Sequence, residues 1–293
     1  MSERVWTCRD ALAWTVEYLT RRGDAHPRRS AEWLLSAATG LSRVEVYALH
    51  DRPLSADERT RYRELIERRA AGEPLQYVTG EMPFRHLVIR VERGVFIPRP
   101  ETEVLVDVAV DHLSAIEAPH ALDLCTGSGA VAVSIAHEVP TAHVWAVDAN
   151  EQAVEAARRN ALYAGVQNRV QVVHGDMFSP LPPDLAGRLD AVVANPPYIP
   201  SAQVPDLPME VLGFEPRLAL DGGPDGLREA RRIAEGAYRW LRPNGLLAME
   251  LASDRAAAMA EELRGSYEEV QVLKDLTGRD RIVVGRKREA SQR

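Results

Sequence analysis

The segment Asn195-Pro196-Pro197-Tyr198 is the part of the chain best suited to group-transfer chemistry. Each proline fixes its own φ and restricts the residue before it, so the loop is stiff and holds the Asn195 amide in place. That amide can accept and donate hydrogen bonds, which suits a planar –NH2 group whose nitrogen must face an electrophile. Tyr198 can stack on a flat group. The segment predicts transfer to a planar nitrogen; the alternative is a structural Pro-Pro loop.

A second candidate site is the turn Cys125-Thr126-Gly127-Ser128-Gly129, which follows an apolar run. The glycines let the backbone approach a ligand, and the next helix presents its positive N-terminal end. Asp148 lies 19 positions after Gly129, and a carboxylate there can accept hydrogen bonds from both hydroxyls of a ribose. The spacing predicts a nucleotide-type ligand.

The spacing alone leaves other interpretations of this turn open. Gly127-x-Gly129-x-x-Ala132 also satisfies the dinucleotide fingerprint, which favours an NAD-dependent enzyme. Asp148 could instead only cap the helix that begins near Asn150. An NAD dehydrogenase, however, leaves the Asn-Pro-Pro-Tyr loop unexplained.

These turns require a sheet to position them, and the chain from about residue 101 onward predicts one. Apolar runs that read as strands cover 120–124, 144–147, 170–173, 191–194, 246–250, 270–273 and 282–284. Amphipathic segments that read as helices separate most of them, notably 151–164, 227–241 and 255–263. This alternation predicts a mainly parallel α/β sheet covered on both faces. Only residues 274–281 separate the last two strands, so they should form an antiparallel hairpin.

The N-terminal third has a different pattern. Thr7 with Asp10 and Ser55 with Glu58 have the spacing of helix capping pairs, and about four short helices are expected in residues 1–75. Residues 87–91 alternate as a strand, and Gly94 offers a turn before Val95-Phe96-Ile97. We therefore predict a helical, substrate-docking domain over 1–75, a β-hairpin linker over 76–98 and an α/β domain over 99–293.

Composition excludes several classes of protein. The 293 residues are 45% hydrophobic and 27% charged, as in ordinary globular chains. The two cysteines, Cys8 and Cys125, are too few for a disulfide framework, and the eight histidines lack metal-ligand spacing, so no metal is expected. No run approaches the ~18–20 apolar residues of a membrane helix, and the charged N-terminus argues against an export signal. These features predict a cytoplasmic enzyme that does not bind a membrane.

Charge argues against a nucleic-acid partner. Residues 1–75 have a net charge of +1, and the rest of the chain, with 23 basic and 31 acidic residues, has −8. An enzyme that grips a duplex usually presents a basic face, because phosphate neutralisation supplies much of its affinity. Direct nucleic-acid binding is therefore not expected.

The two turns together resemble the Rossmann-like S-adenosylmethionine-dependent methyltransferases that modify planar nitrogens. Further segments narrow the resemblance to the release-factor glutamine N5-methyltransferases: Gly72-Glu73-Pro74-Leu75-Gln76-Tyr77, Ile97-Pro98-Arg99-Pro100-Glu101-Thr102-Glu103, Glu215-Pro216-Arg217-Leu218-Ala219-Leu220 and Asp221-Gly222-Gly223-Pro224-Asp225-Gly226-Leu227. These enzymes methylate the glutamine of the Gly-Gly-Gln loop in class 1 peptide-chain release factors. The resemblance spans residues 72–285 and implies a seven-stranded sheet with an antiparallel terminal strand pair, preceded by a small helical bundle.

The resemblance also implies roles for individual residues. S-adenosyl-L-methionine would be the cofactor, and a class 1 release factor the protein partner. The cofactor would contact Cys125, Thr126, Gly127, Ser128, Gly129, Asp148, Asp176, Met177 and Asn195. Asp176 and Met177 would bracket its adenine. Asn195, Pro196 and Tyr198 would be catalytic, and the same three residues with Pro197 would bind the substrate glutamine, under a segment 98–102 that closes over the site.

The sequence departs from the usual family pattern at two places, and two alternative functions stay open. The family usually has glycine at the position of Cys125, where positive φ would strain a cysteine. Glu250-Leu251-Ala252 replaces a usual Glu-x-Gly. The main alternative is a DNA or RNA methyltransferase acting on adenine N6 or guanine N2, because these bases also present a planar –NH2 group. A non-catalytic ribosome-associated binding module is the other.

Overall fold

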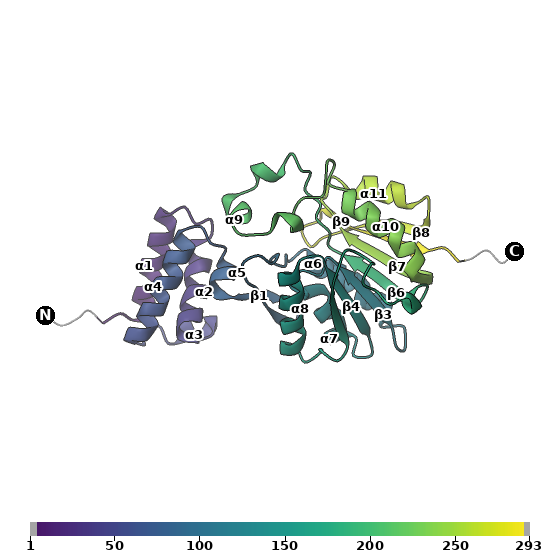
Figure 1. The fold of residues 1–293 in the computed structure, drawn as a ribbon. Coiled ribbons are helices and arrows are strands. Elements are labelled where there is room, and N and C mark those ends of the chain that lie inside the picture. Colours follow the sequence, from purple (N-terminus) through teal and green to yellow (C-terminus); the bar gives the residue numbers. More distant parts are fainter. Residues whose placement is uncertain (1–4, 290–293) are drawn as a thin grey trace. The chain divides into compact units, whose positions relative to one another are not determined.

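The computed structural model describes residues 5–289 and separates them into two compact units (Figure 1). The first unit contains the chain up to Glu81 together with Pro208–Phe214. The second contains Met82–Leu207 and the chain from Glu215 onward. The domain limits predicted from sequence stay a prediction.

The first unit is helical. Its elements are α1 (Cys8–Arg21), α2 (Pro27–Thr39), α3 (Arg43–Ala48), α4 (Ala56–Ala70), α5 (Leu75–Thr79) and the short α9 (Met209–Leu212). Thr7 and Ser55 form the predicted capping boxes with Asp10 and Glu58, which satisfy the free amides of a first helical turn. Side chains such as Leu19 from α1 and Leu34 from α2 are fully buried between the helices.

The second unit contains a seven-stranded sheet. Its strands are β3 (His120–Leu124), β4 (His143–Asp148), β5 (Val170–His174), β6 (Leu189–Ala194), β7 (Leu241–Glu250), β8 (Tyr267–Lys274) and β9 (Asp280–Lys287). The order is β5-β4-β3-β6-β7-β9-β8; β9 runs antiparallel to β7 and β8, and the other pairs are parallel. This confirms the predicted fold class, including the antiparallel terminal pair.

Helices cover both faces of this sheet (Figure 1). They are α6 (Thr102–Leu113), α7 (Ala130–Glu138), α8 (Glu151–Tyr163), α10 (Arg228–Trp240) and α11 (Ala256–Leu263). α10 and α11 share one buried cluster with strand residues such as Leu122, Val192 and Leu247, while α7 packs against both α6 and α8. No helix within residues 5–289 has the length and apolarity needed to cross a membrane.

The β-hairpin exists, but the predicted pairing was wrong. β1 (Glu81–Phe84) pairs with β2 (Leu87–Arg90), and the chain turns at Arg85, whose φ is 52°. Residues 95–97 form no strand, because the Val95 amide donates to the Glu92 carbonyl and the Ile97 amide faces the Glu215 carboxylate. The alternation after Gly94 therefore reflects burial of Val95 and Ile97 and not strand pairing.

Candidate active site

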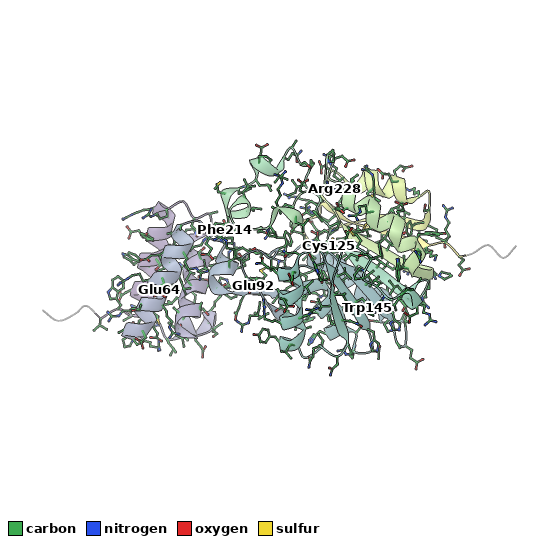
Figure 2. The ribbon with its side chains drawn as sticks, in the orientation of Figure 1. Glu64, Glu92, Cys125, Trp145, Phe214 and Arg228 are labelled. Carbon is green, nitrogen blue, oxygen red and sulfur yellow. The ribbon has the colours of Figure 1, made fainter. Side chains whose placement is uncertain are left out.

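Sheet register places the two predicted turns side by side. β3 and β6 are parallel neighbours, and Leu124 of β3 is opposite Ala194 of β6. The residues that follow, Cys125 and Asn195, therefore leave adjacent strands at the same edge, where open α/β sheets bind their ligands. Figure 2 labels Cys125 at this edge. The geometry required by the predicted roles is present, and the roles themselves stay predictions.

The first turn needs an unusual backbone. Cys125, Gly127 and Gly129 all have positive φ, at 59°, 55° and 81°. A Cβ on Gly129 would lie 2.9 Å from the Cβ of Ala157 in α8, so only glycine allows this close approach. The turn is thus pressed against α8, and the Thr126 and Gly129 amides are held by the carbonyls of Val147 and Thr126.

The buried Asp123 side chain holds the same turn in place by hydrogen bonds. Its side chain is 1% exposed, and Oδ2 accepts hydrogen bonds from the Thr126 hydroxyl at 2.6 Å and the Ala132 amide at 3.1 Å. Burial raises the pKa of Asp123 to about 7, and the bond from Thr126 opposes that rise. The buried carboxyl therefore ties the turn to the start of α7.

The raised pKa of Asp123 predicts a pH-dependent stability. The folded state holds this proton more tightly than the unfolded state, so the free energy of unfolding should fall as pH rises from about 4 to about 7. In Asp123→Asn, which keeps an acceptor oxygen, the fall should be smaller. Urea unfolding of both proteins across this range checks the expectation, and identical pH profiles would contradict it.

Asp148 at the end of β4 faces the glycine turn. Its Oδ2 accepts from the Gly127 amide and its Oδ1 from the Asn150 amide, both at 2.8 Å. The second bond shows that Asp148 does brace the start of α8, where Asn150 is the N-cap. Each carboxylate oxygen still has lone-pair capacity, which suits the two hydroxyls of a ribose. Burial raises the pKa of Asp148, and the two amides counteract this.

The left-handed backbone at Cys125 makes a testable contribution to stability. A non-glycine residue there costs about 1–2 kcal/mol, so we expect Cys125→Gly to exceed Cys125→Ala in free energy of unfolding by about 0.5–1 kcal/mol once the extra freedom of unfolded glycine is subtracted. Alanine is the matched control because it removes the thiol but keeps the Cβ. Urea unfolding measures the difference; equal stability of the two variants would show that the turn is unstrained.

The Asn-Pro-Pro-Tyr loop is held by its own prolines and by one side-chain contact. Pro196 and Pro197 are buried, while Asn195 and Tyr198 are half-buried. The Asn195 Nδ2 donates to the Thr102 hydroxyl at 3.2 Å. Nδ2 is thereby engaged, and Oδ1 is the end of the amide left to meet a substrate. Thr102 comes from the predicted closing segment 98–102.

The glycine-rich segment Asp221–Leu227 braces this loop, a role that sequence reasoning did not assign. The Gly222 amide donates to the Ile199 carbonyl at 2.8 Å, and the Ile199 amide donates to the Leu220 carbonyl at 2.9 Å. A Cβ on Gly222 would lie 2.7 Å from the Pro197 oxygen. A Cβ on Gly226 would collide with the Tyr198 carbonyl. These glycines allow two backbones to touch.

Residues 94–102 form a strap along the same edge of the sheet. The Gly94 carbonyl accepts from Asn150 Nδ2 at 3.0 Å, and Phe96 lies beside Gly127. The buried Glu215 carboxylate accepts from Arg99 at 2.5 Å. Through Phe96 beside Gly127 and Thr102 bonded to Asn195, the strap links the glycine turn to the Asn195 loop.

The predicted adenine-bracketing pair lies at the end of β5. Asp176 is exposed and pairs with Arg232 of α10 at 2.6 Å. Met177 has a φ of 52° and packs, partly buried, against the cluster under α10. Both residues are at the same edge as Asp148, and their contact with an adenine stays a prediction.

Asn160 is a further structural residue that the sequence did not reveal. It is 2% exposed, and its Nδ2 donates to the carbonyls of Ser128, at 2.8 Å, and Arg90, at 2.9 Å. It thus joins the glycine turn to β2. An asparagine inside a helical pattern gives no signal of such a role. Among residues 5–289, no cluster of three or more His, Cys, Asp or Glu side chains could hold a metal.

Comparison with known proteins agrees with this geometry. Residues 10–80 match the family profile described as PrmC N-terminal domain, and residues 88–210 match the methyltransferase small domain. The catalytic domain of hMettl16 in complex with an RNA hairpin has a similar fold, with a TM-score of 0.56 at 16% identity over 78% of this chain and 83% of that chain. The T. thermophilus 16S rRNA methyltransferase RsmC, bound to AdoMet and guanosine, gives a TM-score of 0.51 at 19% identity over 71% of this chain and 50% of that chain.

Sequence relatives are much closer. The release factor glutamine methyltransferase of Moorella thermoacetica is 44% identical over 285 residues, which is 97% of this chain and 99% of the relative. That of Streptomyces coelicolor is 39% identical over 281 residues, or 94% and 96%. Full-length identity at this level, on a sheet whose edge brings the glycine turn and Asn195 together, shows that the chain belongs to the release factor glutamine methyltransferase family.

Proposed function

We propose that this chain transfers the methyl group of S-adenosyl-L-methionine to the side-chain amide nitrogen of the glutamine in the Gly-Gly-Gln loop of class 1 release factors. Membership of the family makes it an S-adenosyl-L-methionine-dependent methyltransferase. The loop glutamine and the identity of the release factor are the finer part of the proposal. A partner in translation termination also implies a cytoplasmic location.

The residues at the edge of the sheet fit this methyl donor. Gly127 and Gly129 leave the turn without side chains, and Asp148 retains acceptor capacity for two ribose hydroxyls. When bound, S-adenosyl-L-methionine supplies a methyl group activated by a positively charged sulfur. The chain's own residues must then hold a weak nucleophile in line with that methyl group.

An amide nitrogen is a poor nucleophile because its lone pair is delocalised into the carbonyl. Holding the nitrogen in the correct orientation must therefore supply much of the rate acceleration. In the proposed mechanism, Asn195 Oδ1 and the Pro196 carbonyl accept the two N–H bonds of the glutamine amide. These acceptors aim the nitrogen and stabilise the positive charge that develops on it during transfer. Tyr198 closes the side of the pocket. The engagement of Asn195 Nδ2 by Thr102 is the observation that most supports this arrangement.

The test is incubation with labelled S-adenosyl-L-methionine and a class 1 release factor, followed by mass mapping of the product. The expected result is one added methyl group on the loop glutamine. DNA and rRNA serve as parallel substrates, since an amino-group methyltransferase would label them instead. A label elsewhere on the release factor would overturn the substrate assignment, and the absence of any labelled product would favour a non-catalytic binding module.

A further inference from the structure

Three neighbouring strands, and not two, contribute to the edge that carries Asn195. Ala194 of β6 is opposite Leu124 of β3 on one side and Met249 of β7 on the other. The register therefore places Glu250, the last residue of β7, beside Asn195. In the sequence, Glu250 stands out only because Glu250-Leu251-Ala252 departs from the usual family pattern.

Glu250 is a fully buried carboxyl, and the Thr102 hydroxyl is the side-chain donor that faces it. The Glu250 side chain is 0% exposed, and within residues 5–289 neither carboxylate oxygen makes a hydrogen bond. Burying such a group is costly, and replacing it with an apolar residue of similar volume would remove that cost. A carboxyl at this position next to the Asn195 loop therefore points to a role in the reaction.

Thr102 lies against both Asn195 and Glu250. It is 3% exposed, its hydroxyl accepts from Asn195 Nδ2 at 3.2 Å, and it faces the Glu250 carboxylate. A hydroxyl has one hydrogen to donate. Because its oxygen receives the Asn195 amide, the buried carboxylate is the acceptor toward which that hydrogen can turn.

We propose that Glu250 is a positioning residue that acts through Thr102 to fix the orientation of the Asn195 amide, with Nδ2 toward Thr102 and Oδ1 toward the methyl-accepting nitrogen. The inference rests on the proposed function. A reversed amide would present an –NH2 group to the glutamine –NH2 group, so two donors would meet and the acceptor needed for transfer would be lost. The contact of Glu250 with Thr102, and of Thr102 with Asn195, forms a relay that disfavours that reversal.

The protonation state of Glu250 determines the direction in which the Thr102 hydroxyl donates its hydrogen. Burial raises its pKa to about 7; Glu101 raises it further, while Thr102, Arg281 and Arg99 lower it. Glu250 in turn faces Tyr198, whose pKa is raised to about 12, mainly by burial. Ionised Glu250 can only accept, so the Thr102 hydroxyl can turn its hydrogen toward it. Protonated Glu250 can donate to Thr102, and the hydroxyl is then free to donate to Asn195 Oδ1 and favour the wrong orientation.

The experiment compares Thr102→Val, Thr102→Ser and Glu250→Gln with the wild-type chain, using S-adenosyl-L-methionine and a release factor. Thr102→Val should lower kcat about tenfold, which is about 1.4 kcal/mol, while KM for the methyl donor changes by less than about twofold. Thr102→Ser, which restores the hydroxyl, should recover most of that loss. The matched control is Thr15→Val, which removes a buried threonine hydroxyl in α1 and should leave kcat unchanged.

The pH profile separates this role from a merely structural one. Wild-type kcat should fall on the acid side of about pH 7, and Glu250→Gln, whose side chain does not titrate in this range, should lose this fall. Unchanged kcat in Thr102→Val, an equal loss in Thr102→Ser, or persistence of the acid fall in Glu250→Gln would each overturn the proposal. If Thr102→Val does not fold, as judged by its melting temperature, the Glu250→Gln profile still decides. A wild-type chain that transfers no methyl group to a release factor would instead overturn the proposed function and this inference with it.

Discussion

Replacing Asn195 with alanine should abolish methyl transfer while leaving the fold largely intact. The substitution removes the Oδ1 acceptor that aims the glutamine nitrogen and stabilises its developing charge, and loss of one such group costs about 10²–10³ in kcat. Asn195 is only half-buried, and among residues 5–289 its side chain makes a single hydrogen bond, to Thr102. The melting temperature should therefore change little. Single-turnover transfer of labelled methyl groups measures the effect on chemistry.

The control for this variant is Asn168→Ala. Asn168 is exposed and precedes β5, at the opposite edge of the sheet from the ends of the strands that carry the site. The Asn168→Ala variant should retain full methyl-transfer activity. Near-normal turnover by Asn195→Ala would refute the proposed role of the amide, whereas a loss of both activity and melting temperature would show that Asn195 acts chiefly in folding.

Gly226→Ala should give the second large effect, although Gly226 is expected to touch neither substrate nor methyl donor. Its φ is 79°, and an added Cβ would collide with the Tyr198 carbonyl. The left-handed backbone alone costs about 1–2 kcal/mol, and the overpacking adds about 1–3 kcal/mol. Relief requires the Asn-Pro-Pro-Tyr loop to move, and a displacement of about 1 Å in a positioning element can cost about 10² in rate. Urea unfolding and kcat measure the two consequences.

Gly278→Ala is a closely matched control. Gly278 has almost the same φ, 82°, but nothing lies within 4 Å of its added Cβ. It sits in the turn between β8 and β9, so its substitution should cost only the backbone strain and leave kcat unchanged. If Gly226→Ala behaves like Gly278→Ala in both measurements, the glycine-rich segment does not brace the loop.

The fold was largely predictable because its signals are local. The alternation of apolar strands and amphipathic helices required crossover connections, and the short link before β9 required an antiparallel hairpin. The capping pairs at Thr7 and Ser55 also act within four residues. The hairpin partner was missed because the alternation of Val95 and Ile97 has the same period as a strand, whereas their amides bond to Glu92 and Glu215.

The site was predictable only in part. Asp148 and Asn195 could be found because Asp148 ends a strand and Asn195 directly follows one, and the carboxyl ends of parallel strands meet at one edge. Residue types that act by packing or by distant contact gave no such signal: Asn160 looks like any helical asparagine, and Glu215 belongs to a segment that was noted without a role. Pro208–Phe214 groups with the helical unit even though more than a hundred residues of the other unit precede it.

The sequence by itself determined which functional groups are present: a stiff loop presenting an amide, a glycine turn, and an acidic residue at the end of the next strand. These properties reside in residue type and short-range spacing, which fix backbone freedom and hydrogen-bonding capacity. Only the tertiary structure decided that Thr102 engages Asn195, that Glu250 is buried beside them, and that Gly226 touches Tyr198. Those contacts join residues distant in the chain, and their geometry depends on strand register and close packing, which no local pattern encodes.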